Sequence, residues 1–367
     1  MELARRTRWI AYSLPVALAA VAALARPAPP GALAAAGAMP ERGCALAGEA
    51  NARGTLDGAP AWYRLEPLLD GTGTLVGRQL TAGRGTARWT AQLSPESFAS
   101  GPVGGRVLVG DDDGHRSRLR VLDTVRGCWS VVGTEAGVIR SALLTSDAAG
   151  VYEHRVDRAT RRDLGVFLRE IRGSGAPRQV AAGLEADAVH GPTFSTTLLL
   201  GDDGQLAVSS CGERACRTRV VNPATGAASP IRETGPAAGV VGAQLVAPEP
   251  CEGLPCPMQI IDVASGGVTS LGPVMGPAVL TPDGSGAVVL PAEAGLRVAR
   301  PDDPARSAEV PGTRGLAPIA RTSTSETGFE GPAGLVAVGP GGSAADPSLV
   351  RLLNPATLQI TAGEVLP

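Results

Sequence analysis

Gln205–Gly226 reads QLAVSSCGERACRTRVVNPATG, and Ala243–Gly266 reads AQLVAPEPCEGLPCPMQIIDVASG. Each stretch predicts the same unit, which is an apolar strand, a loop between two cysteines, a second strand and a tight turn. The cysteines Cys211 and Cys251 are 40 positions apart, and so are the turn residues Asn222 and Asp262. A period of this length built from short strands is typical of a propeller array.

Similar units extend along the rest of the chain. Arg118–Leu122, for example, alternates polar and apolar residues as a half-buried strand does. One tight turn marks each unit, and the seven turns open at Asp70, Asp123, Arg172, Asn222, Asp262, Arg300 and Asn354. Their intervals of 38 to 54 residues predict an all-β protein with a single β-propeller of four-stranded antiparallel blades. Seven blades are favoured, and six blades with an N-terminal hairpin across them stay an alternative, because the first unit shows only one clear hairpin.

The composition suits a globular β-protein and excludes two classes of function. Apolar residues make up 44% of the chain, and we interpret the 49 glycines and 31 prolines mainly as turn residues. The chain has no lysine, which excludes Schiff-base and lysine-base chemistry. The net charge of −2 leaves no basic surplus for binding a phosphate backbone, so we expect no nucleic-acid partner.

The N-terminus has the order of a secretory signal. Arg5, Arg6 and Arg8 precede an apolar run over residues 9–25, which ends in the small-x-small triplet Ala23–Ala25. An uncleaved membrane tether is the alternative, although this run is short for spanning a bilayer. The predicted order is a signal peptide, an Ala/Pro/Gly-rich leader and the propeller, over residues 1–25, 26–55 and 56–367.

Six cysteines fit an exported protein, because an even number in such a chain predicts disulfides. Two pairs each close the loop between the two strands of their own unit. The third pair would link the N-terminal segment to the strand that starts at Cys128. A four-thiolate zinc site is the alternative, but such sites usually have tighter Cys-x-x-Cys spacing. The predicted pairs are Cys211–Cys216, Cys251–Cys256 and Cys44–Cys128. We expect no metal and no cofactor.

The turns also resemble those of a known group of proteins. Thr281–Gly286 before a strand, and Val220–Gly226 and Ile260–Gly266 at the ends of strands, are similar to the repeats of bacterial TolB-like and YncE-like propellers. The resemblance covers roughly residues 60 to 362 and rests on structural turns. It implies an exported binding or scaffold module, although some related propellers are lactonases or other enzymes. The chain lacks the Trp-Asp ending of WD-repeats and the tryptophan ring of quinone-cofactor propellers.

Candidate catalytic residues are few, since the chain has three histidines. His115 follows an acidic turn and is expected in solvent, whereas His154 lies in a strand with Glu153 on its opposite face. His190 is the strongest candidate because it precedes the first strand of the fourth unit, where strand starts surround the channel of a propeller. Arg140, at the matching start in the third unit, is its expected partner. A structural role is the alternative for both residues.

Two acidic runs have the composition of a calcium loop, but they fit turns better. Asp111–Gly114 and Gly201–Gly204 lack the alternating oxygen ligands and the distant bidentate Glu of such a loop. Asp and Gly are also the residues that tight turns require. The chain has no Gly-x-Ser-x-Gly, His-Glu-x-x-His or lysine-containing phosphate loop. A Ser-His-Asp triad assembled in space stays open, because its members need not be close in sequence.

These observations favour an exported, non-enzymatic binding or scaffold propeller of the cell envelope. Its partner would be an unknown protein, small molecule or carbohydrate, held by the loops of one face and the channel mouth. The alternative is a propeller hydrolase or lyase that acts on a small or carbohydrate substrate near the axis. Acidic, His or Arg side chains converging at one channel mouth would favour the enzyme, and apolar or glycine-lined strand starts would oppose it.

Overall fold

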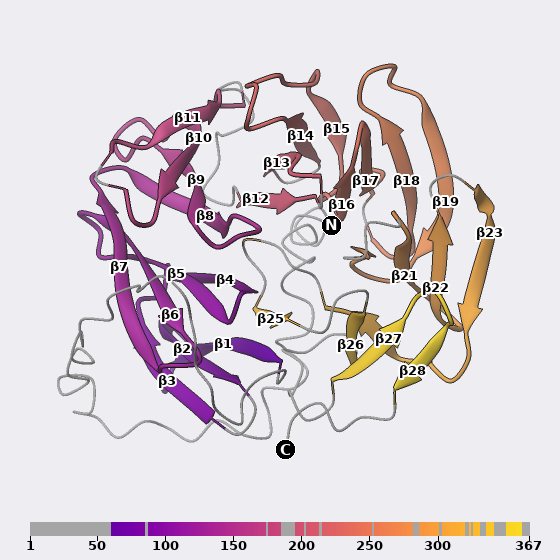
Figure 1. Ribbon diagram of the computed structural model, residues 1–367, viewed down its shortest axis with the longest axis horizontal. Coiled ribbons are helices and arrows are strands. Elements are labelled where there is room, and N and C mark those ends of the chain that lie inside the picture. The colour runs from indigo at the N-terminus through magenta and orange to yellow at the C-terminus, as the bar shows by residue number, and fades with distance from the viewer. Residues whose placement is uncertain are drawn as a thin grey trace, which may run out of the picture.

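The computed structural model describes residues 60–84, 87–173, 175–184, 195–201, 203–212, 215–251, 253–281, 286–300, 303–319, 323, 326–330, 335–340 and 350–361. This part of the chain forms seven four-stranded antiparallel sheets that surround a central axis as blades (Figure 1). The seven-bladed propeller is therefore confirmed, and the six-bladed alternative is wrong. No helix in the described ranges is long and apolar enough to span a membrane. The predicted signal segment and leader lie outside the described residues.

Blades 2 to 6 are each built from four consecutive strands, with the first strand innermost. Blade 2 contains β4 (Phe98–Val103), β5 (Arg106–Asp112), β6 (Ser117–Asp123) and β7 (Cys128–Glu135). Blade 3 contains β8 (Val138–Leu144), β9 (Gly150–Val156), β10 (Asp163–Glu170) and β11 (Arg178–Ala181). Blade 4 contains β12 (Ser195–Leu200), β13 (Leu206–Cys211), β14 (Cys216–Val221) and β15 (Arg232–Thr234). Blade 5 contains β16 (Gly239–Val241), β17 (Gln244–Pro248), β18 (Cys256–Asp262) and β19 (Val268–Val274). Blade 6 contains β20 (Val279–Leu280), β21 (Val288–Ala292), β22 (Gly295–Arg300) and β23 (Asp303–Val310).

The first and last blades share the closure of the ring. Blade 7 contains β24 (Leu316–Pro318), β26 (Val336–Pro340), β27 (Arg351–Asn354) and β28 (Gln359–Thr361). Blade 1 contains β1 (Ala61–Leu69), β2 (Leu75–Arg84) and β3 (Ala87–Leu93), and its innermost strand is β25 (Thr327–Glu330). The chain thus leaves blade 7 after its first strand, completes blade 1 and returns. The first unit is incomplete in the sequence because its innermost strand comes from near the other end of the chain.

Antiparallel pairing places every innermost strand start on one face of the propeller, which we call the top face. The connections from second to third strand, and from one blade to the next, also lie there. The other connections lie on the bottom face. Six of the seven marker turns join third and fourth strands at the bottom face, as predicted. The turn at Asp70 instead joins β1 and β2, the second and third strands of blade 1, at the top face.

Strand β25 is fastened at both of its ends. Its last residue, Glu330, accepts hydrogen bonds of 2.7 Å from the backbone N–H groups of Gly104 and Gly105 in blade 2. Before β25, the N–H of Leu198 in β12 donates to the Ser323 hydroxyl over 2.7 Å, and the Ser323 N–H donates to the Leu198 carbonyl. Ser323 lies in the connection between β24 and β25, which we call the closing segment. Because β12 is the innermost strand of blade 4, opposite blades 7 and 1, this contact places Ser323 across the channel.

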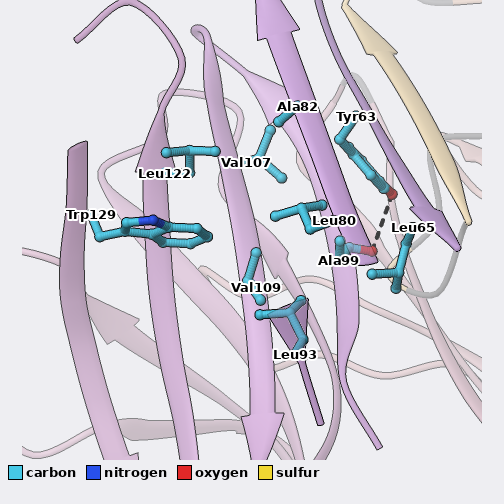
Figure 2. Packing of buried hydrophobic residues seen from close by; sticks show 10 residues of the cluster. All are labelled: Tyr63, Leu65, Leu80, Ala82, Leu93, Ala99, Val107, Val109, Leu122 and Trp129. Atoms are coloured by element: carbon cyan, nitrogen blue, oxygen red, sulfur yellow. Dashed lines mark hydrogen bonds between the residues drawn. The ribbon is translucent and has the colours of Figure 1, made fainter. Parts of the chain in front are cut away.

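Apolar side chains between neighbouring blades form the core. Between blades 1 and 2, ten buried residues pack together, and the Tyr63 hydroxyl donates a 3.1 Å hydrogen bond to the Ala99 carbonyl (Figure 2). Trp129 closes the outer side of this cluster from β7. The scarcity of aromatic residues, 3% of the chain, means that Val, Leu, Ile and Ala supply most of the other interfaces.

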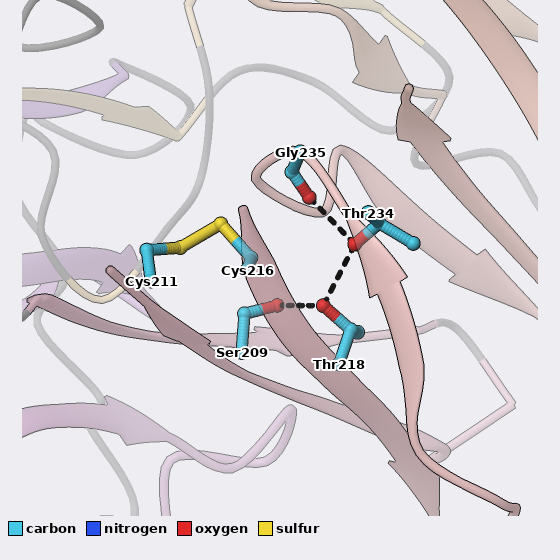
Figure 3. Close-up of a disulfide and its surroundings, with 6 residues drawn as sticks. All are labelled: Ser209, Cys211, Cys216, Thr218, Thr234 and Gly235. Atoms are coloured by element: carbon cyan, nitrogen blue, oxygen red, sulfur yellow. Dashed lines mark hydrogen bonds between the residues drawn. A yellow bond between two sulfur atoms is a disulfide. The ribbon is translucent and has the colours of Figure 1, made fainter. Parts of the chain in front are cut away.

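Two predicted disulfides are confirmed. Cys211–Cys216 and Cys251–Cys256 close the loops between second and third strands of blades 4 and 5, so both lie on the top face. Next to the first, a chain of hydroxyl hydrogen bonds crosses blade 4 (Figure 3), from Ser209 through Thr218 and Thr234 to the Gly235 carbonyl. Cys128 is also disulfide-bonded, and its predicted partner Cys44 lies outside the described residues.

Candidate functional site

Charged side chains gather on the top face over blades 1 to 3, and we call this set the charged rim. It consists of Arg78 and Glu326 from blade 1, Glu96, Asp111, Asp112 and Arg120 from blade 2, and Arg140, Arg158 and Arg161 from blade 3. The innermost strands of blades 1 to 7 all start at uncharged residues, which are Thr327, Phe98, Val138, Ser195, Gly239, Val279 and Leu316. Beside these starts, the rim places Glu326, Glu96 and Arg140 on the side of blades 1 to 3.

Most of the rim is satisfied by its own contacts. Asp111 accepts hydrogen bonds from the Ser97 hydroxyl, at 2.7 Å, and from the Ser94 N–H, and its second oxygen lies 3.6 Å from Arg120. Burial raises the pKa of this carboxyl, but the hydrogen bonds from Ser94 and Ser97 and the charge of Arg120 together outweigh burial and hold the pKa below its usual value. Asp111 is therefore an ionised structural anchor for the loop that leads into β4.

Arg158 and Asp112 form the strongest ion pair of the rim. The two guanidinium nitrogens lie 2.6 and 3.1 Å from the two carboxylate oxygens, which is the bidentate geometry that arginine favours. Arg158 also donates to the carbonyls of Gly114 and Ala136. Asp112 in turn accepts from the Gly114 N–H and the Ser117 hydroxyl. Both side chains are thus fully used in joining blade 2 to blade 3.

Arg140 is much less satisfied. Its side chain, 28% exposed, starts from the third residue of β8, and its nearest carboxylate is Glu96, at 3.8 Å. The guanidinium makes no hydrogen bond within the described part of the chain, and its Nε atom is buried. Burial lowers the pKa of Arg140, and Arg161 lowers it further, while Glu96 counteracts both. Arg140 thus lies beside a second cation with little compensation.

The interface of blades 2 and 3 contains a second ionic cluster, away from the channel mouth. Glu153 is fully buried, and one of its oxygens lies 2.5 Å from Arg155 and 3.1 Å from Arg169. Both arginines also contact Glu135, at the end of β7. Burial raises the pKa of Glu153, and the two arginines oppose this rise. The predicted alternation is confirmed, because Glu153 pairs with Arg155 on the face opposite His154.

Ser141, His154 and Asp163 come together from three adjacent strands of blade 3. His154 Nε2 lies 2.8 Å from Asp163 Oδ1, and Ser141 is the register partner of His154. All three are buried, however, and the Ser141 hydroxyl bonds Thr196 of the next blade at 2.9 Å. These residue types are those of an acyl-transfer triad, but without solvent contact they act as a structural polar cluster.

The remaining candidates have clear outcomes. His190 lies outside the described residues, so its pairing with Arg140 stays a prediction. His115 is exposed in a turn, as predicted. Asp111–Gly114 is a turn at the top face, and the Gly201–Gly204 run turns at the bottom face. Among the described residues, no three His, Cys, Asp or Glu side chains group as a metal site.

The sequence matches no protein-family model and no curated protein. The structure is similar to TolB from Acinetobacter baumannii, with a TM-score of 0.43, 11% identity and coverage of 75% of this chain and 67% of TolB. It is also similar to a prolyl endopeptidase, with a TM-score of 0.50, 12% identity and coverage of 84% of this chain and 49% of the other. For an oligogalacturonate lyase in complex with manganese, the TM-score is 0.46, the identity 12% and the coverage 83% and 85%.

These similarities concern the fold. TolB, whose repeats the turns of this chain resemble, is among the structural neighbours. The chain spans about half of the length of the prolyl endopeptidase, 49%. At 12% identity, that likeness shows a shared propeller and assigns no activity.

Sequence reasoning singled out Arg140 but missed Arg158, Arg161 and Glu96. Their grouping depends on which blade follows which around the axis, so no local motif contains it. Arg161 does have a local signal, which is its position in a five-residue turn where three of the four other described copies have glycine.

Proposed function

We propose that this protein is an exported binding or scaffold propeller of the cell envelope and that it holds its partner on the top face. The observation that carries the proposal is the combination of a charged rim with a channel that the closing segment crosses at Ser323. A crossed channel favours recognition across an outer surface. The two disulfides support an oxidising compartment outside the cytoplasm.

The test is co-sedimentation of the processed, oxidised protein with isolated cell envelopes. The top-face double variant Glu96→Arg/Arg116→Glu exchanges two charges without changing the net charge. Its bottom-face counterpart is Glu170→Arg/Arg172→Glu, at exposed positions at the end of β10. We expect the top-face variant alone to reduce the bound fraction, with wild-type binding weakening as salt is raised. Equal binding by wild type and both variants would contradict the proposal.

A propeller enzyme is the second candidate, and the weakly neutralised guanidinium of Arg140 favours it. An arginine in this state can hold the anionic part of a substrate or stabilise charge that develops in a transition state. A panel of hydrolase and lyase substrates tests this reading. Turnover that Arg140→Leu abolishes, while Arg172→Leu retains it, would support an enzyme.

A further inference from the structure

The backbone of Arg161 adopts a conformation that most residues avoid. Its φ is 59°, and left-handed φ values cost free energy for any residue with a Cβ atom. In the described residues, the other non-glycine positions with positive φ are Ala148 and Leu358. An arginine at such a position calls for a physical reason.

Other copies of the same turn allow a comparison, because this five-residue turn occurs five times within the described residues. In each copy, the side chain of the first residue accepts hydrogen bonds from the N–H groups of the third and fourth residues. The copies begin at Asp123, Asp157, Asn222, Asp262 and Asn354. In three copies the fifth residue is glycine, with φ values of 64°, 73° and 77° at Gly127, Gly226 and Gly266.

The two exceptions differ in what their side chains do. Leu358 packs against the apolar core of blades 6 and 7, which compensates for its backbone strain. Arg161 is exposed, and its side chain makes no hydrogen bond or ion pair within the described part of the chain. Among the described copies, its turn is also the one on the top face, between the second and third strands of blade 3. Glycine would satisfy the fold there, and no contact within the described residues accounts for the arginine.

Arg161 adds its charge to that of Arg140, because its turn lies against the start of β8. In that turn, Arg158 donates hydrogen bonds to the carbonyls of Ala136 and Gly137, which directly precede β8. The cations near Arg140 are Arg158 and Arg161, and the nearby anions are Glu96 and Asp112. Asp112 is fully used by Arg158, as described above, and Glu96 is 72% exposed and 3.8 Å away. This local set carries one more positive than negative charge. Two adjacent guanidinium groups with spare donors match the chemistry of an oxyanion.

We infer that Arg140 and Arg161 form a binding site for an oxyanion, either a carboxylate or a phosphate group. The inference rests on the proposed function, since it names the chemical group that the top face recognises. The Arg158–Asp112 pair holds blade 3 against blade 2 and so fixes the turn that carries Arg161. The anion lies between the two guanidinium groups and relieves their mutual repulsion.

Calorimetric titration of the purified, oxidised full chain tests the site, with sodium acetate in one arm and sodium phosphate in the other. Sodium chloride keeps the ionic strength constant. We expect saturable binding of at least one anion, and the tighter anion identifies the group as a carboxylate or a phosphate. Arg161→Gly and Arg140→Leu should each weaken this binding by about tenfold or more. Arg172→Gly, an equal loss of charge at an exposed position on the bottom face of the same blade, should leave it unchanged.

The thermal midpoint of Arg161→Gly gives a second, independent readout. We expect it to equal or exceed that of the wild type, because glycine relieves the backbone strain. The inference is wrong if neither anion binds, if Arg161→Gly binds as the wild type does, if Arg172→Gly weakens binding equally, or if Arg161→Gly clearly lowers the midpoint. Small anions and purified protein are used here, so this test can fail while the envelope-binding test succeeds, and the reverse.

Discussion

The side-chain hydroxyl of Ser323 accepts a 2.7 Å hydrogen bond from the backbone N–H of Leu198, across the channel of the propeller. Ser323 belongs to the segment between β24 and β25, and Leu198 to the innermost strand of blade 4. The ring is therefore closed through the connection between β24 in blade 7 and β25 in blade 1, which contacts blade 4 at Ser323. The stability of the whole ring should depend on how well β25 and this connection pack against the neighbouring blades.

Gly328 in β25 provides the sharpest test of that fit. A Cβ atom there would lie 2.1 Å from Tyr63 Cε1 and 2.2 Å from the Gly101 carbonyl oxygen. Since the carbonyl belongs to the backbone, Gly328→Ala should destabilise the protein by about 1–3 kcal/mol. Urea denaturation measures the change. Gly71→Ala is the control, because a Cβ atom at Gly71 meets nothing within 4 Å, and equal stability of the two variants would show that closure tolerates a looser β25.

The hydroxyl chain of blade 4 should depend on its middle member. Thr218 is fully buried and bonds Ser209 and Thr234 over 2.9 and 3.0 Å. Thr218→Val keeps the shape but leaves the buried Ser209 hydroxyl without this partner, at an expected cost of about 1–3 kcal/mol. Thr269→Val, at an exposed site in β19, should change stability by less than about 0.5 kcal/mol. A negligible effect at Thr218 would mean that Ser209 finds another acceptor.

Asp163 should make stability depend on pH in the acid range. Burial raises the pKa of this carboxyl, but hydrogen bonds from His154, Gly165 and Leu184 outweigh burial and hold the pKa below 3.8. A lowered folded-state pKa contributes stability above pH 3.8 that is lost as the pH falls through the folded value.

Asp163→Asn should therefore cost about 2–3 kcal/mol at neutral pH, and the difference from the wild type should shrink below pH 4. Denaturant midpoints measured from pH 7 down to pH 3 check this. Asp123→Asn is the control, since asparagine occupies the equivalent turn position at Asn222 and Asn354. A difference that stays constant across this range would show that ionisation of Asp163 is not involved.

The top-face disulfides should each contribute through the unfolded chain. Both link cysteines with a sequence separation of 5, and the loop-entropy relation gives about 2 kcal/mol for so short a loop. Cys211→Ser/Cys216→Ser should lower the denaturation free energy by about this amount. The same measurement in reductant should then show a smaller further loss than the wild type shows. An unchanged free energy in the double variant would mean that the hairpin is equally constrained without the bridge.

Much of the fold was readable from the sequence, because its signals are local. Turns such as Asn222–Gly226 are built from hydrogen bonds between a side chain and backbone groups two or three residues later, so their residue types reveal them. The even spacing of these turns predicted seven blades, and the two cysteine pairs were evident because each closes a single hairpin. The signal segment stays a prediction, as it lies outside the described residues.

Ring closure and the charged rim were decided only in three dimensions. Strand β25 is four residues long and pairs with β1, which lies near the other end of the sequence. The residue pattern around Thr327–Glu330 therefore does not indicate which blade this strand joins. Arg140 and Arg161 are brought together by strand register within blade 3, and Glu96 by the packing of blade 2 against it. Local hydrogen bonds specify the turns of this protein, whereas the juxtaposition of its charges depends on how the blades pack around a closed ring.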